Sequence, residues 1–198
     1  MIHELLEKRY SPKAFDDKNI EQEDLIKLLE AARWSPSSMN EQPWRFIVGV
    51  KNEDETHDKI YDTLADGNKL WAKNAPVLIL TIASNFYQRN GEPNKHAGYD
   101  LGQAIANLTF QASAQELYVH QMGGFSAQKA KELFDIPEGF TPMSVVAIGH
   151  LGNSEDLPEK VRPVDKSKRK RKELEEIVFQ DYFGNKSDLV QSESTLKS

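Results

Sequence analysis

The sequence predicts an α+β fold, in which helices of unequal length pack against a sheet. Helical periodicity recurs along the chain, only three segments are clear strands, and the two kinds of element do not alternate as in a doubly wound sheet. The 198 residues suffice for one substantial hydrophobic core.

The first third of the chain is predicted to hold two helices, a strand and a weaker helix. Residues 2–8 have the composition of a short helix. Residues 20–33 place apolar side chains on one face at helical spacing, with acidic residues in the first turn. A Pro-Ser-Ser turn ends this helix, residues 45–50 follow as a strand, and residues 54–65 are the weaker helix candidate.

The remaining elements include the most apolar segment. Residues 77–83, VLILTIA, predict a central strand that is covered on both faces. Residues 98–119 have helical spacing and many small side chains, which predicts a long helix packed closely in the core. A short helix over 127–135 and a third strand over 144–151 follow, and then come an irregular basic stretch and a charged helix.

Composition limits the class of protein. The chain has no cysteine, which excludes disulfides, thiolate catalysis and cysteine metal sites, and fits a cytoplasmic protein. No apolar run approaches the ~20 residues of a membrane span, so we expect no membrane partner. The N-terminus is charged within a few residues, unlike a signal peptide.

The charge distribution is uneven. Residues 160–172 hold eight basic side chains and one acidic one, so this segment carries a net +7 in a chain of net −6. An acidic body argues against general nucleic-acid binding and favours a tail or a localised anion site. The basic string alone also permits a nucleic-acid or nuclear-localisation role.

Most catalytic motifs are missing. The five histidines show no i, i+4 or His-x-His spacing, so we expect no metal site. The sequence has no Walker loop, no G-x-G-x-x-G and no G-x-S-x-G, and its carboxylates suggest no hydrolase pair. We therefore expect no catalytic side chain and a chemistry that a cofactor supplies.

Four short motifs remain: KRYSPKAF (8–15), SPSSMNEQPW (35–44), QMGGF (121–125) and KSKRKRK (166–172). Singly, each has an ordinary explanation as a surface segment, a helix-ending turn, a glycine turn or a solvated basic run. Considered together, they suggest a ligand site. The stretch 35–44 offers many hydrogen-bonding groups to a flat polar ligand, and the basic residues suit a phosphate.

In this order the motifs resemble those of the FMN-dependent nitroreductase family. KRYSPKAF resembles its Arg-x-Ser-x-Lys/Arg-x-Phe motif, and SPSSMNEQPW matches Pro-Ser-Ser-x-Asn-x-Gln-Pro-Trp at every defined position. WAKNAPVLIL (71–80) resembles the family's Ala-Pro strand entry, and RKELEEIV (171–178) its terminal Arg-x-x-Leu-Glu-Glu element. The resemblance spans residues 2–183.

The resemblance implies a nitroreductase-like α+β domain over residues 1–183, with a mixed or antiparallel sheet, and a polar flexible tail over 184–198. It implies an intertwined homodimer with FMN at the subunit interface. NAD(P)H would donate hydride to flavin N5, and a nitroaromatic, quinone or related small molecule would accept the electrons by a ping-pong cycle. The alternatives are an FMN storage or sensor protein without turnover, and a nucleic-acid-binding protein that uses residues 160–172.

The resemblance also implies roles for individual residues. Arg9 with Ser11 would bind the phosphate, Lys13 would approach the N1/O2 edge of the ring, and the Gly123 N–H would face N5. A positive charge at N1/O2 would favour the reduced flavin. The residues implied to bind the cofactor are Arg9, Tyr10, Ser11, Lys13, Pro36, Ser37, Ser38, Asn40, Gln42, Asn68, Met122, Gly123, Gly124, Arg169 and Arg171.

Several assignments stay open. The wall formed by the Pro-Ser-Ser stretch would come from the other subunit, whereas Trp44 is expected in the core. Pro12 departs from the usual family residue and could shift Lys13. The basic cluster leaves open which of Arg169, Lys170 and Arg171 contacts the phosphate. Residues 84–97 would form a lid over the flavin, in which Phe86 and Tyr87 contact the substrate. The alternative is that these two residues belong only to an exposed loop.

Overall fold

The computed structural model describes residues 2–162 and 169–191, so part of the basic segment 160–172 lies outside the described residues. The chain divides into two compact units, Met1–Pro163 and Val164–Ser198, and each is described by itself. The domain boundary at residue 183 stays a prediction.

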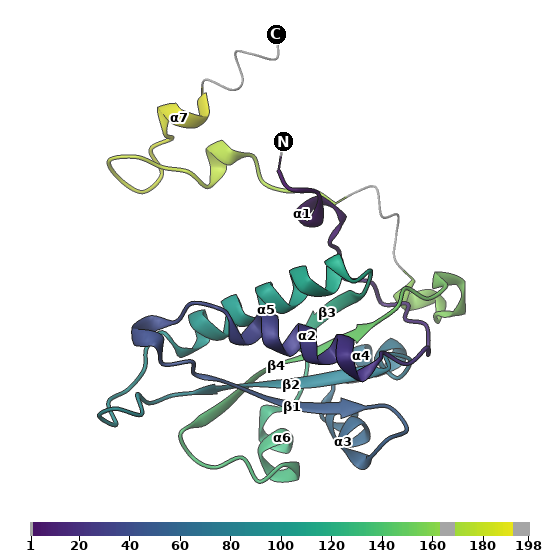
Figure 1. The fold of residues 1–198 in the computed structure, drawn as a ribbon. Helices are drawn as coiled ribbons and strands as arrows, with labels where there is room; N and C mark the ends of the chain where they lie inside the picture. Colours follow the sequence, from purple (N-terminus) through teal and green to yellow (C-terminus); the bar gives the residue numbers. More distant parts are fainter. Residues whose placement is uncertain (1, 163–168, 192–198) are drawn as a thin grey trace. The chain divides into compact units, whose positions relative to one another are not determined.

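The first unit is built on a four-stranded antiparallel sheet (Figure 1). Its strands lie in the order β1-β2-β4-β3, so that β1 and β3 form the two edges. Their bounds are β1 Trp44–Val50, β2 Val77–Ser84, β3 Tyr118–Met122 and β4 Phe140–Gly149. The α+β class is confirmed, and the sheet is antiparallel throughout.

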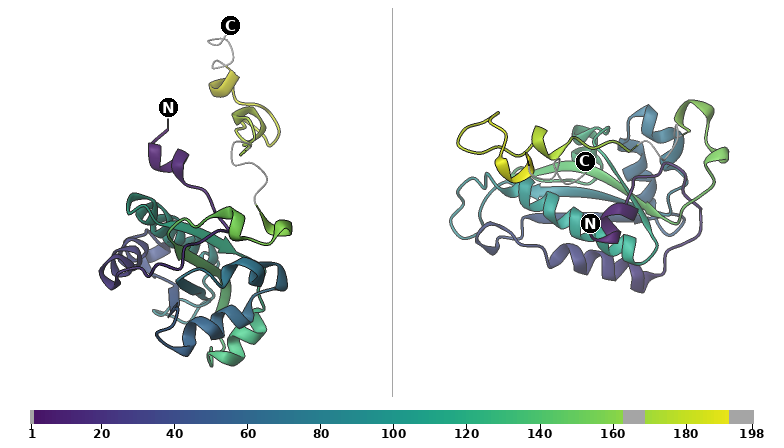
Figure 2. Two further views of the ribbon diagram at one scale, coloured as in Figure 1. Left: turned by 90° about the vertical axis from the view of Figure 1, so that its right-hand side faces the viewer. Right: turned by 90° about the horizontal axis from the view of Figure 1, so that it is seen from above.

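Helices cover both faces of this sheet, with α2 and α5 on one face and α3 and α6 on the other (Figure 1). Seen from above, α2 and α5 run side by side (Figure 2). The helices of this unit are α1 Glu4–Lys8, α2 Gln22–Arg33, α3 Glu55–Thr63, α4 Asp66–Ala72, α5 Ala97–Ala114 and α6 Ala127–Leu133, with 3-10 turns η1 Ser38–Asn40, η2 Ser154–Asp156 and η3 Glu159–Val161.

Strand β2 joins the two halves of the core. All eight of its residues are buried, as its apolar sequence predicts. Alternate side chains point to opposite faces of a strand, so one strand contributes to two hydrophobic clusters. Val77, Ile79 and Ala83 pack with α2 and α5, whereas Leu78, Leu80 and Ile82 pack with α3 and α4.

The helix predicted over 98–119 is present as α5, but its predicted C-terminal end is wrong. Helix α5 stops at Ala114, and strand β3 follows four residues later. The stop is a Schellman motif, in which the N–H of Leu117 bonds the Ala112 carbonyl at 2.8 Å. Glu116 takes the left-handed conformation at φ 59°, where glycine is usual, so the sequence carries no sign of the turn.

The weaker helix predicted over 54–65 is confirmed as α3, and α4, which was not predicted, follows it. Two further elements differ from the prediction. Strand β4 begins at Phe140, before the predicted residue 144, and its pairing with β2 shifts register between Thr81 and Ile82. The charged helix after the basic stretch is only the 3-10 turn η5, Leu174–Glu176.

The second unit is described over residues 169–191. It holds η5 and a short helix, α7 Asp188–Gln191. Between them Phe179 pairs with Lys186 in an isolated antiparallel bridge, and Lys186 forms a 2.9 Å ion pair with Glu175.

No helix within the described ranges has the length and apolar composition needed to cross a membrane. Across those same ranges, no three histidine, aspartate or glutamate side chains are grouped so that they could hold a metal ion.

Candidate functional site

The segment before α2 docks against the end of β4 through its backbone. Phe15 forms an antiparallel bridge with Leu151, and the Gly152 N–H bonds the Ala14 carbonyl at 3.1 Å. Both Ala14 and Phe15 are buried. Residues 9–15 are therefore a fixed part of the first unit.

The same segment runs alongside β3. The Tyr10 ring contacts the Tyr118 ring edge-on, with centroids 5.3 Å apart. Two residues further along both segments, the Pro12 carbonyl accepts a 2.8 Å hydrogen bond from the His120 Nδ1. This alignment carries Lys13 towards the end of β3.

The side chains of this segment differ in burial. Pro12 is buried, Ser11 is exposed, and Arg9 and Lys13 are half-buried. In extended chain, residues two apart point the same way. The segment therefore presents a hydroxyl and two cations on one side, a donor set that suits a phosphate and an electron-rich ring edge.

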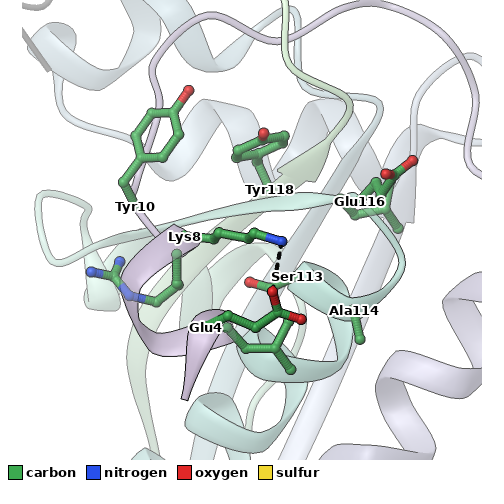
Figure 3. Close-up of a pocket in the computed structure, with 10 residues that line it drawn as sticks. Glu4, Lys8, Tyr10, Ser113, Ala114, Glu116 and Tyr118 are labelled. Atoms are coloured by element: carbon green, nitrogen blue, oxygen red, sulfur yellow. Dashed lines mark hydrogen bonds and ion pairs between the residues drawn. The ribbon is translucent and has the colours of Figure 1, made fainter. Parts of the chain in front are cut away.

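Arg9 and Tyr10 also line a pocket of about 610 Å³ between α1 and the last turn of α5 (Figure 3). The paired rings of Tyr10 and Tyr118 form one side of it, and a 3.1 Å ion pair joins Lys8 to Glu4 on the α1 side. The other lining residues are Leu5, Ser113, Ala114, Glu116 and Leu117.

The glycine pair after β3 is held from α4. The Gly124 carbonyl accepts hydrogen bonds from the Asn68 Nδ2 at 2.9 Å and from the Ala65 N–H at 3.0 Å. A Cβ at Gly124 would lie 2.9 Å from the Asn68 Nδ2, so a side chain here would displace the Asn68 amide from its bond. A Cβ at Gly123 would meet no atom within 4 Å, and Met122 is 2% exposed in the core.

Asn68 therefore has a structural partner that the sequence did not predict. Its amide nitrogen is committed to Gly124, which fixes the glycine turn relative to α4. The structure thus brings Asn68 and Gly124 together, and Lys13 approaches the same end of β3.

The serine-rich loop after α2 is tied to α5. The Ser38 N–H donates to the carboxylate of the buried Asp100 at 3.0 Å. The Asn107 amide, near the middle of α5, donates to the Ser35 hydroxyl at 2.7 Å. Within the loop, the Ser37 hydroxyl accepts from the Gln42 N–H at 3.0 Å.

The loop backbone is strained. Met39, Asn40 and Gln42 have φ of 56°, 55° and 51°. These values lie in the left-handed region, which residues other than glycine rarely adopt. Such conformations cost about 1–3 kcal/mol each and gather at functional sites. Pro36 lies beside this stretch and is exposed, whereas Trp44 is 6% exposed and belongs to the core, as predicted.

The predicted lid joins this loop. The Tyr87 hydroxyl lies 3.3 Å from the Ser38 hydroxyl, and the Gln88 N–H donates to the Glu41 carboxylate at 2.7 Å. Phe86 is 46% exposed, pairs with Pro93 in an isolated bridge and lies next to Gly139. The structure thus brings Tyr87, but not Phe86, to the serine-rich loop.

Two sets of the predicted site residues lie at opposite ends of α5, and a third set, Asn68 with the glycine pair, lies after β3. Ser38 is bonded to Asp100 near the start of that helix, whereas Arg9 and Tyr10 share a pocket with Ser113 in its last turn. Thirteen helical residues separate Asp100 from Ser113, which is about 20 Å along the axis. Figure 1 shows the loop after α2 and the segment before it at opposite ends of that helix.

The predicted arginines of the basic cluster belong to the second unit. Arg169 and Arg171 are both exposed, and the Arg171 Nη1 donates to the Lys170 carbonyl at 3.0 Å. The structure describes them apart from the first unit, so their role at the phosphate stays a prediction.

One titratable group beside the segment is shifted. Burial lowers the pKa of His120 below its usual 6.5, the bond to the Pro12 carbonyl opposes this change, and the nearby charge of Lys13 lowers the pKa further. His120 is therefore neutral at pH 7, and its Nδ1 carries the hydrogen that Pro12 accepts.

Two residues that shape the site were missed from the sequence. Asp100 occupies the buried stripe of α5 with Leu101 and Ala104, and an acidic residue on an apolar stripe is a usable signal. His120 was counted only among unpaired histidines, because nothing in the sequence reports its distant partner.

Three comparisons relate the chain to known proteins. A sequence model of the nitroreductase family matches residues 6–70 and 62–150. A Mycolicibacterium smegmatis protein named "Uncharacterized 15.4 kDa protein in ask 5'region" is 36% identical over 151 residues, which cover 71% of this chain and 98% of that protein. The "FMN reductase [NAD(P)H]" of Bacillus subtilis is 27% identical over 91% of this chain and 73% of its own.

The structural comparison gives a similar result. The crystal structure of an oxidoreductase containing FMN superposes with a TM-score of 0.85 and 34% sequence identity, and the match covers 94% of both chains.

Proposed function

This chain belongs to the nitroreductase family, and we propose that it transfers electrons from NAD(P)H to a nitroaromatic, quinone or related small molecule. It is an NAD(P)H-dependent flavin oxidoreductase with FMN as its cofactor. Bound FMN supplies the redox chemistry, because it accepts hydride at N5 and passes two electrons on. The chain's own residues bind and orient it.

The observation that carries the proposal is the alignment of residues 9–13 with β3. The bond between Pro12 and His120 aligns the segment with β3, the strand that leads to the glycine pair. Arg9 and Ser11 would hold the phosphate by charge-assisted hydrogen bonds, and Lys13 would lie at the N1/O2 edge of the ring. The Gly123 N–H would face N5, and a Cβ built on this glycine would meet no described protein atom within 4 Å.

The second half of the site would come from another copy of the chain. Pro36, Ser37, Ser38, Asn40 and Gln42 would form its polar wall, with Phe86 and Tyr87 contacting substrate. The separation of about 20 Å along α5 between the Ser38 contact and the Arg9 pocket supports this assignment. A two-fold dimer would set one group of each chain opposite the other group of its partner.

An absorbance spectrum tests cofactor binding. Purified protein should show a flavin band near ~450 nm and should oxidise NAD(P)H when a quinone or nitroaromatic is added. Protein that binds FMN but oxidises no NAD(P)H with any acceptor would indicate storage or sensing. Colourless protein that takes up no FMN would contradict the proposal.

A mixed dimer tests the shared site. Arg9→Ala should weaken FMN binding by roughly ten- to a hundredfold, because a hydrogen bond to a charged group contributes about 1.5–3 kcal/mol. Asn40→Ala alters the other half. Co-expressed chains carrying one substitution each would form dimers with one doubly altered site and one intact site. Half-stoichiometric FMN binding at wild-type affinity supports the shared site, whereas two weakened sites would show that each chain builds its own.

A further inference from the structure

His120 links two parts of the site that lie far apart in sequence. Its Nδ1 is 2.8 Å from the carbonyl oxygen of Pro12, 108 residues earlier. A carbonyl oxygen only accepts, so the Nδ1 must donate, and the neutral ring therefore carries its hydrogen on that atom. This one bond joins the middle of β3 to the residue before Lys13.

The ring is held so that it can make this bond. Trp71 of α4 is fully buried, and its ring lies 4.5 Å from the imidazole, at a tilt of 38°. Phe15 stacks on the same tryptophan at 6.1 Å. The imidazole is thus packed by the helix that also carries Asn68, which limits its freedom to turn away from Pro12.

A bond to the Pro12 carbonyl controls the direction of the next residue. The proline ring already fixes φ near −65°, so the remaining freedom is the rotation that orients its carbonyl. Holding that oxygen sets the peptide plane between Pro12 and Lys13, because the peptide unit is planar. The bond from the Gly152 N–H to the Ala14 carbonyl holds the chain on the other side of Lys13, so the two bonds together restrict the direction in which the Lys13 side chain leaves the backbone.

We propose that His120 is a positioning residue that aims Lys13 at the flavin ring by holding the Pro12 carbonyl. This role rests on the proposed function, in which Lys13 stabilises the negative charge that reduction adds. It also gives a reason for Pro12, which replaces the usual family residue at this place. A neutral imidazole holds the segment without adding a second positive charge beside Lys13.

The test compares variants that keep or lose the bond. His120→Leu removes the donor, whereas His120→Asn keeps a side-chain N–H that can reach the same carbonyl. His150→Leu is the matched control, because among the described residues the His150 side chain makes no hydrogen bond. Each variant is titrated anaerobically with oxidised and with reduced FMN, and the ratio of the two dissociation constants gives the potential shift.

We expect Lys13→Ala and His120→Leu each to lower the preference for reduced FMN by about tenfold, which equals ~30 mV for two electrons. The affinity for oxidised FMN should change less. His120→Asn and His150→Leu should stay within about twofold of wild type. The double variant should lower the preference for reduced FMN no more than Lys13→Ala alone, because both substitutions remove the same interaction.

A second measurement needs no flavin. Histidine nitrogen NMR of the apo-protein at pH 7.5 should show His120 neutral, with its hydrogen on Nδ1 and coupled across the bond. A hydrogen on Nε2 instead would overturn the proposal, as would an unchanged FMN preference in His120→Leu beside a lowered one in Lys13→Ala. If Lys13→Ala also has no effect, Lys13 is not the ring cation and the proposal fails while FMN binding stands. A wild-type chain that binds no FMN would overturn the proposed function and the role of His120 together.

Discussion

Left-handed residues are concentrated in the loop that forms the predicted wall of the site. Of the seven non-glycine residues with positive φ in the described part of the chain, three are Met39, Asn40 and Gln42. Asparagine tolerates this conformation through its short polar side chain, but methionine gains nothing from it. Met39 is also 66% exposed, so packing does not repay its strain.

Met39→Gly should therefore stabilise the protein. The left-handed conformation costs a side-chain residue about 1–2 kcal/mol, and the added backbone entropy of glycine offsets about 0.5–1 kcal/mol of that gain. The free energy of unfolding should rise by up to ~1 kcal/mol in urea titrations of the apo-protein at fixed concentration. Met39→Val, which is β-branched, should lower it by a similar amount. A destabilising glycine would show that the Met39 side chain makes contacts that outweigh the strain.

His120 gives a pH dependence with a defined sign. Its folded-state pKa lies below 6.5, so the unfolded chain binds the proton more readily. Its contribution to stability is complete above about pH 6.5 and is lost as the pH falls through the folded pKa. Urea titrations from pH 7.5 to 5 should show a fall in stability that His120→Asn reduces. Glu30 does not interfere in this pH range. The hydrogen bond from Arg33 lowers its pKa to about 2, so its effect on stability changes only below its usual pKa of 4.5. Equal slopes in wild type and His120→Asn would contradict the lowered pKa.

At the scale of elements, the segment before α2 depends on a close approach to the residue after β4. A Cβ at Gly152 would lie 2.5 Å from the carbonyl carbon of Phe15, and that atom is backbone that cannot turn away. The glycine therefore sets how near residues 14–16 come to the sheet, and through them how Lys13 is presented.

Gly152→Ala should lower the free energy of unfolding by about 1–3 kcal/mol, as overpacking does. It should also weaken FMN binding, because the displaced segment carries Arg9 and Lys13. Gly102→Ala is the matched control. That glycine is exposed within α5 with nothing within 4 Å of a built Cβ, so alanine should add about 0.5–1 kcal/mol. Urea titration and FMN fluorescence check both. Unchanged stability in Gly152→Ala would mean that the segment tolerates the shift.

Elements with periodic sequence could be predicted, and those defined by distant contacts could not. The almost wholly apolar run over 77–83 identified β2, and helical spacing identified α2 and α5. Strand β3 was missed because its edge position leaves Tyr118 and Gln121 partly in water, so no apolar run marks it. The types of Arg9, Ser11 and Lys13 indicated an anion site, but only the folded chain shows what aligns them.

At the scale of the whole molecule, we propose that a second copy of the chain completes the site. The family resemblance predicts this division, and the positions of the Ser38 contact and the Arg9 pocket at the two ends of α5 support it. The arginines of the second unit would add the last phosphate contacts.

Arg169→Ala and Arg171→Ala test that addition. A true ligand should lose FMN affinity by roughly ten- to a hundredfold at fixed salt, whereas a solvated neighbour should change it by less than about twofold. Lys172→Ala is a charge-matched control from the same run. Isothermal titration at two salt concentrations separates a direct contact from general attraction. Equal small losses in all three variants would remove the basic cluster from the site.

The burial of β2 on both faces has a consequence for synthesis of the chain. Its last residue, Ser84, pairs with Phe140 of β4, which is 56 residues further along. At about 5–20 residues per second, a ribosome needs roughly 3–11 s to make that distance. During that time the nascent chain carries an uncharged run, VLILTIA, paired at best with β1 alone. Such runs stack readily with their own kind, so this interval is when the growing chain depends most on chaperones.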